Sequence, residues 1–162
     1  MPDITVGMAD LRVTADPDAR LVTYALGSCL GIAVHDPVAR VGGLLHVMLP
    51  LSELDAAKAQ ANPAMFVDTG VPALFRACYA LGGVKARMVV KVAGGASSAA
   101  PGEADQFQIG KRNLLTLRKL LWKNGVLLHA DDVGGVQTSR TVYLDVATGT
   151  FTVRSNGQEI TL

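Results

Sequence analysis

The chain has 162 residues, of which 15 are basic and 14 acidic, and 49% are hydrophobic. We therefore expect one domain over residues 1–162, with a core large enough to fold without metals or disulfides. The balanced charge disfavours a nucleic-acid partner, the two cysteines make no disulfide framework, and no apolar run reaches the roughly 20 residues of a membrane-spanning helix.

The first part of the chain is β-like. Its N-terminus has neither the basic nor the apolar region of an export signal, so we expect a cytoplasmic protein without membrane insertion. Residues 8–13 and 20–26 read as short strands, with Asp16-Pro17-Asp18 as a turn between them. The second of these strands carries Thr23 and leads to Cys29.

Residues 27–31 read Gly-Ser-Cys-Leu-Gly, which has the spacing of the Gly-x-Ser-x-Gly nucleophile elbow with Cys29 in the serine position. An elbow leads from a strand into a helix. Here residues 32–35 run instead into Asp36-Pro37, a turn signal, and then into the apolar residues 41–49. The pattern therefore predicts a β-hairpin and disfavours an α/β-hydrolase.

The expected hairpin register brings a thiol and an imidazole together. If residues 36–39 form a four-residue loop, His35 opposes Arg40 and Cys29 opposes His46. Opposed residues share one face of a sheet, with Cβ atoms about 4.5–5.5 Å apart. A histidine at that distance lowers the thiol pKa and carries its proton to a leaving group.

Both residues also have ordinary structural explanations. A free cysteine in an apolar strand is usually a small buried hydrophobe, and a lone histidine between apolar neighbours is usually a core or edge residue. A zinc site is weakly supported, because no Cys-x-x-Cys or His-x-x-x-His pair supplies further ligands. A bulge at Gly42-Gly43 would move His46 to the other face.

Helices and further strands follow the hairpin. We expect a short helix with Ser52 as its N-cap, and a second one over residues 68–81. In the second helix the apolar spacing buries one face and makes Cys78 inert packing, which leaves Cys29 as the reactive cysteine. Further elements are expected as a strand over 86–93, a helix over 113–123, and strands over 126–129, 140–146, 150–154 and 159–162. Two groups of strands with two or three inserted helices indicate an α+β fold.

The loop from Gly94 to Asp105 is glycine- and serine-rich and follows a strand, as binding loops often do. A glycine pair can cradle phosphate, but the Gly-Lys-Ser ending of a P-loop is absent. We expect this loop to form one wall of a shallow groove at Cys29. Candidate substrate contacts are Gly27, Ser28, Ser97 and Ser98.

Motifs along most of the chain resemble those of the CheD family of chemoreceptor glutamine deamidases. They are Thr23, Leu26-Gly27-Ser28-Cys29, Asp36, Gly42-Gly43, His46-x-Met48-Leu49-Pro50, Lys91, Gly94-Gly95-Ala96, Ile109-Gly110, Asn113, Asp132-Val133-Gly134-Gly135 and Arg140. Two positions depart from the family, which commonly has Phe at position 93 and Met at 98, where this chain has Ala93 and Ser98.

The resemblance implies a catalytic Cys29, His46 and Thr23, and a mixed β-sandwich core with two or three helices packed on the outside. It implies hydrolysis of glutamine side chains in the cytoplasmic helical region of chemoreceptors, with glutamate methyl esters as further substrates. No cofactor and no metal are implied. The alternative function is a regulatory binding module that pairs with a CheC-type chemotaxis phosphatase.

Overall fold

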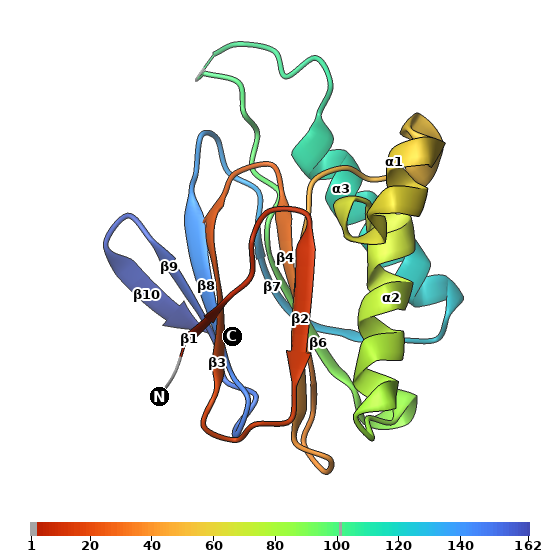
Figure 1. Ribbon diagram of the computed structural model, residues 1–162. Helices are drawn as coiled ribbons and strands as arrows, with labels where there is room; N and C mark the ends of the chain where they lie inside the picture. Colours follow the sequence, from red (N-terminus) through yellow and green to blue (C-terminus); the bar gives the residue numbers. More distant parts are fainter. Residues whose placement is uncertain (1–2, 101) are drawn as a thin grey trace.

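The computed structural model, which describes residues 3–100 and 102–162, is a sandwich of two five-stranded β-sheets with helices on one outer face (Figure 1). The first sheet has the order β1 (Asp3–Thr5), β3 (Arg20–Leu26), β8 (Arg140–Asp145), β9 (Phe151–Ser155) and β10 (Gln158–Thr161). The second sheet has the order β2 (Asp10–Thr14), β5 (Val41–Val47), β4 (Leu30–Asp36), β6 (Val89–Gly94) and β7 (Leu128–Val133). Each sheet contains one parallel pair, β1 with β3 and β6 with β7. The expected α+β class with a mixed β-sandwich core is confirmed.

Three α-helices and three short 3₁₀ helices complete the described chain. They are α1 (Ala56–Ala61), α2 (Val67–Ala80), α3 (Ile109–Lys123), η1 (Ser52–Leu54), η2 (Pro63–Met65) and η3 (Lys85–Arg87). Among the described residues, none of these helices has the length and apolarity required to span a membrane. In Figure 1, α2 and α3 lie on the side of the second sheet that faces away from the first.

The second sheet has two buried faces, which explains why β4 and β5 read as nearly continuous apolar runs. On β5, Leu44 belongs to the core between the sheets, whereas Leu45 and Val47 belong to the core beneath the helices. Alternation along the strand then turns His46 toward the first sheet. The buried stripe of α2, including Cys78, packs in the core beneath the helices, as the helical periodicity predicted.

The predicted hairpin register is wrong by two positions. Asp36 pairs with Val41, so the four-residue loop comprises residues 37–40, and Gly31 rather than Cys29 opposes His46. The cause is the Asp36 carboxylate, which accepts hydrogen bonds from the backbone N–H groups of the loop while Asp36 itself stays paired in the strand. The pairing is continuous through Gly42 and Gly43, so no bulge intervenes, and a shift of two preserves the face of each side chain.

Several boundaries differ from those expected from sequence. Ser52 does not cap α1. Its backbone N–H and hydroxyl donate to Asp68 in the first turn of α2, and Asp55 is the N-cap of α1 instead. Helix α3 begins four residues before the expected Asn113, and β7 lies two residues later than the strand predicted over 126–129. The short strand β1 was not predicted.

Candidate functional site

Cys29 lies where the chain crosses from one sheet to the other. Strand β3 ends in the first sheet at Leu26, residues 27–29 form a bend, and β4 begins in the second sheet at Leu30. Cys29 is half-buried and packs against the core between the sheets. The bend therefore holds the thiol at one end of the sandwich, on the inter-sheet side, where it keeps some contact with solvent.

Thr23 reaches the same space from the first sheet. A bulge between Thr23 and Leu26, with Ala25 at φ 57°, inserts one extra residue into β3, so that both Thr23 and Leu26 are buried. Gly31 stands opposite His46, and a Cβ there would lie 3.5 Å from the Thr23 methyl group. The bare glycine thus leaves room for the side chains of Leu26 and Val142, which a Cβ there would approach to 2.8 and 3.2 Å.

A hydrogen-bond chain across the sandwich determines the tautomer of His46. The Thr23 hydroxyl donates to the backbone carbonyl of Val6 at 2.7 Å and lies 2.7 Å from Nδ1 of His46. A hydroxyl has one proton, and a carbonyl can only accept. The Thr23 oxygen must therefore accept from Nδ1–H of His46, which leaves Nε2 of the neutral ring as the unprotonated nitrogen.

Nε2 of His46 is buried and has no hydrogen-bond partner within the described chain. No hydrogen bond joins it to the Cys29 thiol, although both side chains belong to the inter-sheet face. An unpaired buried polar atom is unusual in a folded protein and is typical of a group kept available for chemistry. His46 is thus a base whose lone pair is free.

Burial keeps both groups neutral. It raises the pKa of the Cys29 thiol above its ordinary value, and the backbone N–H of Cys29 beside the sulfur partly offsets that rise. Burial likewise lowers the pKa of the His46 imidazole. The resting groups are accordingly a thiol and a neutral imidazole near pH 7.

The start of the Gly94 to Asp105 loop holds the Cys29 bend by backbone contacts. Gly95 N–H donates to the Cys29 carbonyl at 2.9 Å, and Ala96 N–H donates to the Gly27 carbonyl at 2.9 Å. Gly94 has φ 115°, and a Cβ on it would lie 2.2 Å from the Cys29 carbonyl oxygen. Only glycine fits at this position, where the loop base contacts the backbone of Cys29.

Two buried side chains tie this bend to the surrounding elements. Nδ2 of Asn113 on α3 donates to the Ser28 carbonyl at 3.0 Å and to the Met48 carbonyl, just after β5, at 3.1 Å. Arg140 on β8 donates to the Gly94 carbonyl at 3.3 Å and to the Asp132 carboxylate at 3.2 Å. Asn113 therefore links the cysteine bend to the end of the histidine strand.

These supporting roles were missed at the sequence level. The motifs contained Asn113, Arg140 and Gly94, but the contact between Asn113 and Ser28 joins residues 85 positions apart. No local periodicity or spacing reports such a contact. The only available signal was that these residues belong to the same set of motifs as Cys29.

The expected substrate contacts occupy different surroundings. Gly27 and Ser28 belong to the Cys29 bend. The Ser97 hydroxyl donates to Asp105 at 3.0 Å, and the Ser97 backbone is bridged to Val136, whereas Ser98 is exposed. Contact between these serines and a substrate stays a prediction, as does the groove.

The remaining candidate groups belong to the framework. Cys78 is fully buried, and burial together with the Asp36 charge raises its pKa to about 12. Nδ1 of His129 accepts from Val90 N–H, and Asp131 pairs with Arg118 on a different side from Asp132. The described residues contain no cluster of three or more His, Cys, Asp or Glu side chains suited to a metal ion.

Comparisons with known proteins give a consistent result. A family model described as CheD chemotactic sensory transduction matches residues 48–155. The chain is 50% identical over 157 residues to the "Probable chemoreceptor glutamine deamidase CheD 1" of Syntrophus aciditrophicus, covering 97% of this chain and 96% of that protein. It is 47% identical to the corresponding protein of Solibacter usitatus, with 98% and 92% of the two chains covered. It is 41% identical to that of the archaeon Pyrococcus abyssi, with 94% and 91% covered.

The family model begins after the bend and the histidine strand, but the pairwise likenesses cover 97% and 98% of this chain. The full-length similarity and the family match together show that this chain belongs to the CheD family.

Proposed function

We propose that this protein deamidates glutamine side chains of chemoreceptors, with Cys29 as the nucleophile, His46 as the general base and acid, and Thr23 as the residue that orients His46. The observation that carries the proposal is the chain from Val6 through Thr23 to His46, which leaves Nε2 unprotonated and without a partner in the described structure. The substrate class follows from the names of the relatives in Syntrophus and Solibacter. Such a reaction would take place on the cytoplasmic side of the cell.

In the first half-reaction, the Cys29 sulfur attacks the carboxamide carbon of glutamine while its proton passes to Nε2 of His46. The C–N bond then breaks, and the proton held by His46 goes to the departing nitrogen, which leaves as ammonia. Thr23 supports both steps, because its hydroxyl oxygen accepts from Nδ1–H and stabilises the imidazolium that forms in between.

In the second half-reaction, water attacks the thioester carbonyl while His46 takes a proton from it; the C–S bond then breaks and that proton returns to the sulfur, which gives glutamate and the free thiol. The Cys29 N–H, which lies beside its own sulfur, is a natural donor to the oxyanion of each tetrahedral intermediate. A glutamate methyl ester offers the same carbonyl and would leave methanol, so it is a second expected substrate.

The test is mass spectrometry of a purified chemoreceptor cytoplasmic fragment incubated with the protein. We expect glutamine peptides to gain the mass that accompanies replacement of NH₂ by OH, with ammonia released in equal amount. Cys29→Ala should abolish this conversion and retain the fold, since the thiol is half-buried in a bend. Cys78→Ala should retain activity and lower the free energy of unfolding by about 1–2 kcal/mol through a small core cavity.

The opposite pattern, with activity lost in a folded Cys78→Ala protein and retained in Cys29→Ala, would reverse the assignment of the two cysteines. A wild-type protein that leaves every receptor glutamine and methyl ester unchanged would instead favour the alternative, a regulatory module that pairs with a CheC-type phosphatase.

A further inference from the structure

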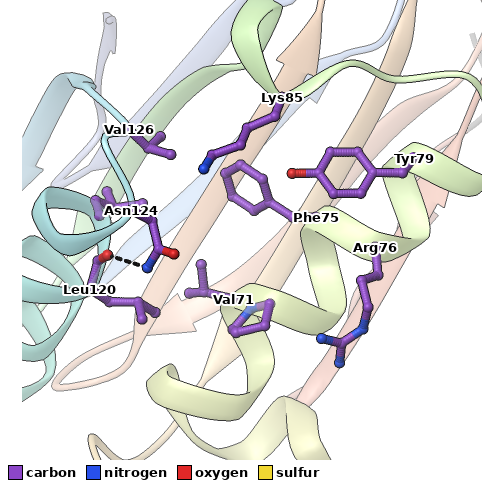
Figure 2. Close-up of a pocket in the computed structure, with 10 residues that line it drawn as sticks. Val71, Phe75, Arg76, Tyr79, Lys85, Leu120, Asn124 and Val126 are labelled. Atoms are coloured by element: carbon purple, nitrogen blue, oxygen red, sulfur yellow. Dashed lines mark hydrogen bonds between the residues drawn. The ribbon is translucent and has the colours of Figure 1, made fainter.

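A groove lies between the C-terminal halves of α2 and α3, away from Cys29. One of its two hollows, of about 210 Å³, is lined mostly by apolar side chains, together with Arg76, Lys85 and Asn124. Figure 2 shows Phe75 and Tyr79 of α2 on one wall and Leu120, Asn124 and Val126 on the facing wall. A second hollow shares Lys85, Asn124 and Val126 with the first, so the two are continuous. We call them the α2–α3 groove.

The rim of the α2–α3 groove is unusually apolar for a surface. Leu127 is 69% exposed and Val84 is 45% exposed, and both line the second hollow. Contiguous exposed apolar side chains around a hollow are typical of a protein interaction site. Two hollows of about 210 and 670 Å³ that share lining residues can each take a side chain of one docked segment.

Basic residues outnumber acidic ones along these two helices, in which Asp68 at the start of α2 is the one acidic residue. Residues 69–102 contain four basic residues and residues 106–130 contain five, whereas neither segment contains an acidic residue. Within the described part of the chain, Arg76 and Lys85 form no salt bridge. The apolar groove therefore carries positive charge in its lining, from Arg76 and Lys85.

The groove is remote from the proposed chemistry. Cys29 immediately precedes β4, and Asp36 at the other end of β4 accepts a hydrogen bond from the backbone of Val84 in the second hollow. Seven strand residues span about 20 Å at 3.3 Å each. An occupant of the groove therefore leaves Cys29 open, and Figure 1 places the two regions toward opposite ends of the sandwich.

We propose that the α2–α3 groove docks an amphipathic helix of a partner protein that carries an apolar stripe flanked by acidic residues. Apolar side chains at i, i+3, i+4 and i+7 would enter the two hollows, as in other helix-in-groove complexes. Acidic flanks would complement Arg76, Lys85 and Lys123. A concave groove fits a helix better than the flat surface of a lipid bilayer.

The test is selection from a phage-displayed library of helical peptides, with the wild-type protein as target. We expect enriched peptides to carry an apolar stripe with Asp or Glu on its flanks and to bind more weakly as salt increases. The double variant Arg76→Glu/Lys85→Glu should bind a synthetic copy of the most enriched peptide at least tenfold more weakly than wild type does. Lys58→Glu, an exposed charge reversal on α1, should bind it like wild type.

Leu127→Glu supplies a second groove variant at an exposed position where unfolding is not expected, and it should lose affinity similarly. Both groove variants should keep the wild-type rate of Cys29 alkylation, which separates this proposal from the proposed function. The docking proposal would be overturned if no peptide were enriched or if the enriched peptides were basic. It would also be overturned if the groove variants bound the peptide as tightly as wild type. Tight binding to phosphatidylglycerol vesicles that the same variants abolish would overturn it too, because that result identifies a membrane surface.

Discussion

At the scale of single residues, Thr23 is the group whose removal most directly tests the proposed chemistry. Thr23→Val keeps the shape of the side chain but removes the oxygen that accepts from Nδ1–H of His46. The ring then loses the contact that defines its tautomer. Because general acid–base catalysis contributes about 10²–10⁴-fold, we expect kcat to fall by about tenfold or more, with KM for a receptor fragment nearly unchanged.

The matched control is Thr23→Ser, which retains the hydroxyl and should recover most of the activity. Steady-state kinetics on one receptor fragment would compare the three proteins. Equal kcat in wild type and Thr23→Val would show that His46 needs no partner at Nδ1. Equal loss in the serine and valine variants would indicate that the methyl group, packed near Gly31, is the feature that matters.

The pH dependence follows from burial of the two reacting groups. His46 must be neutral to act as a base, and its pKa is lowered by burial, so kcat/KM should hold down to about pH 6.5, the ordinary histidine value, and fall only below it. The pKa of Cys29 is raised, so alkylation by iodoacetamide in the free protein should keep accelerating past about pH 8.5. An alkylation rate that is already constant below pH 7 would mean a preformed thiolate–imidazolium pair.

At the scale of elements, the approach of β6 to the Cys29 bend depends on one glycine. Gly94→Ala would place a methyl group against the Cys29 carbonyl and push the bend away from Asn113 and Gly95. We expect deamidation to fall by about 10²-fold, the loss typical of a small misplacement of reacting groups. Kinetics and circular dichroism together would separate misplacement from unfolding.

Gly102→Ala is the control for this change, because Gly102 also has a positive φ, 86°, but a Cβ there meets nothing within 4 Å. Both variants carry the backbone cost of a positive φ, and only Gly94→Ala carries the clash. Similar activity in the two variants would contradict the claim that close approach to Cys29 is the reason for glycine at position 94.

The sequence predicted best those elements whose pattern of apolar residues depends directly on which of their faces are buried. In α2, apolar residues recur at i, i+3, i+4 and i+7 because one face of the helix is buried. In β4 and β5 the apolar runs are nearly continuous because both faces of the strands are buried. The hairpin register was missed because it depends on a side chain: Asp36 binds the loop backbone and also remains in the strand. Rules that predict hairpins from loop length do not include hydrogen bonds from the loop backbone to a strand side chain.

In the candidate site, too, sequence patterns predicted some features and missed the contacts between the sheets. Cys29 and His46 were expected to oppose one another in the hairpin, but Cys29 lies in the bend before β4, and Gly31 opposes His46 instead. The contacts of Thr23 with Val6 and His46 cross between sheets, and those of Asn113 connect three separate elements. Such contacts depend on how the sheets stack, which spacing along the chain does not encode.

At the scale of the whole molecule, the end of the sandwich opposite Cys29 is held by a buried carboxylate. The Asp36 side chain accepts from the backbone N–H groups of Val38, Ala39 and Val84 and from the Arg87 guanidinium. Burial alone would raise the pKa of Asp36, but these hydrogen bonds outweigh it and hold the pKa well below its ordinary value. Asp36 thus ties the β4–β5 hairpin to η3 and to the end of α2.

Asp36→Asn should therefore lower the free energy of unfolding at pH 7 by about 2–3 kcal/mol, somewhat less than for a fully buried ion pair because Arg87 is partly exposed. Since the folded pKa of Asp36 is depressed, its contribution is complete above the unfolded value of about 3.9 and disappears as the pH falls through the folded value. Urea unfolding at pH 7, 5, 4 and 3 should accordingly show a steeper acid loss for wild type than for Asp36→Asn. Asp131→Asn, which breaks the exposed pair with Arg118, should change stability by less than about 1 kcal/mol at every pH. Parallel acid losses in wild type and Asp36→Asn would show that another group controls the acid sensitivity of the fold.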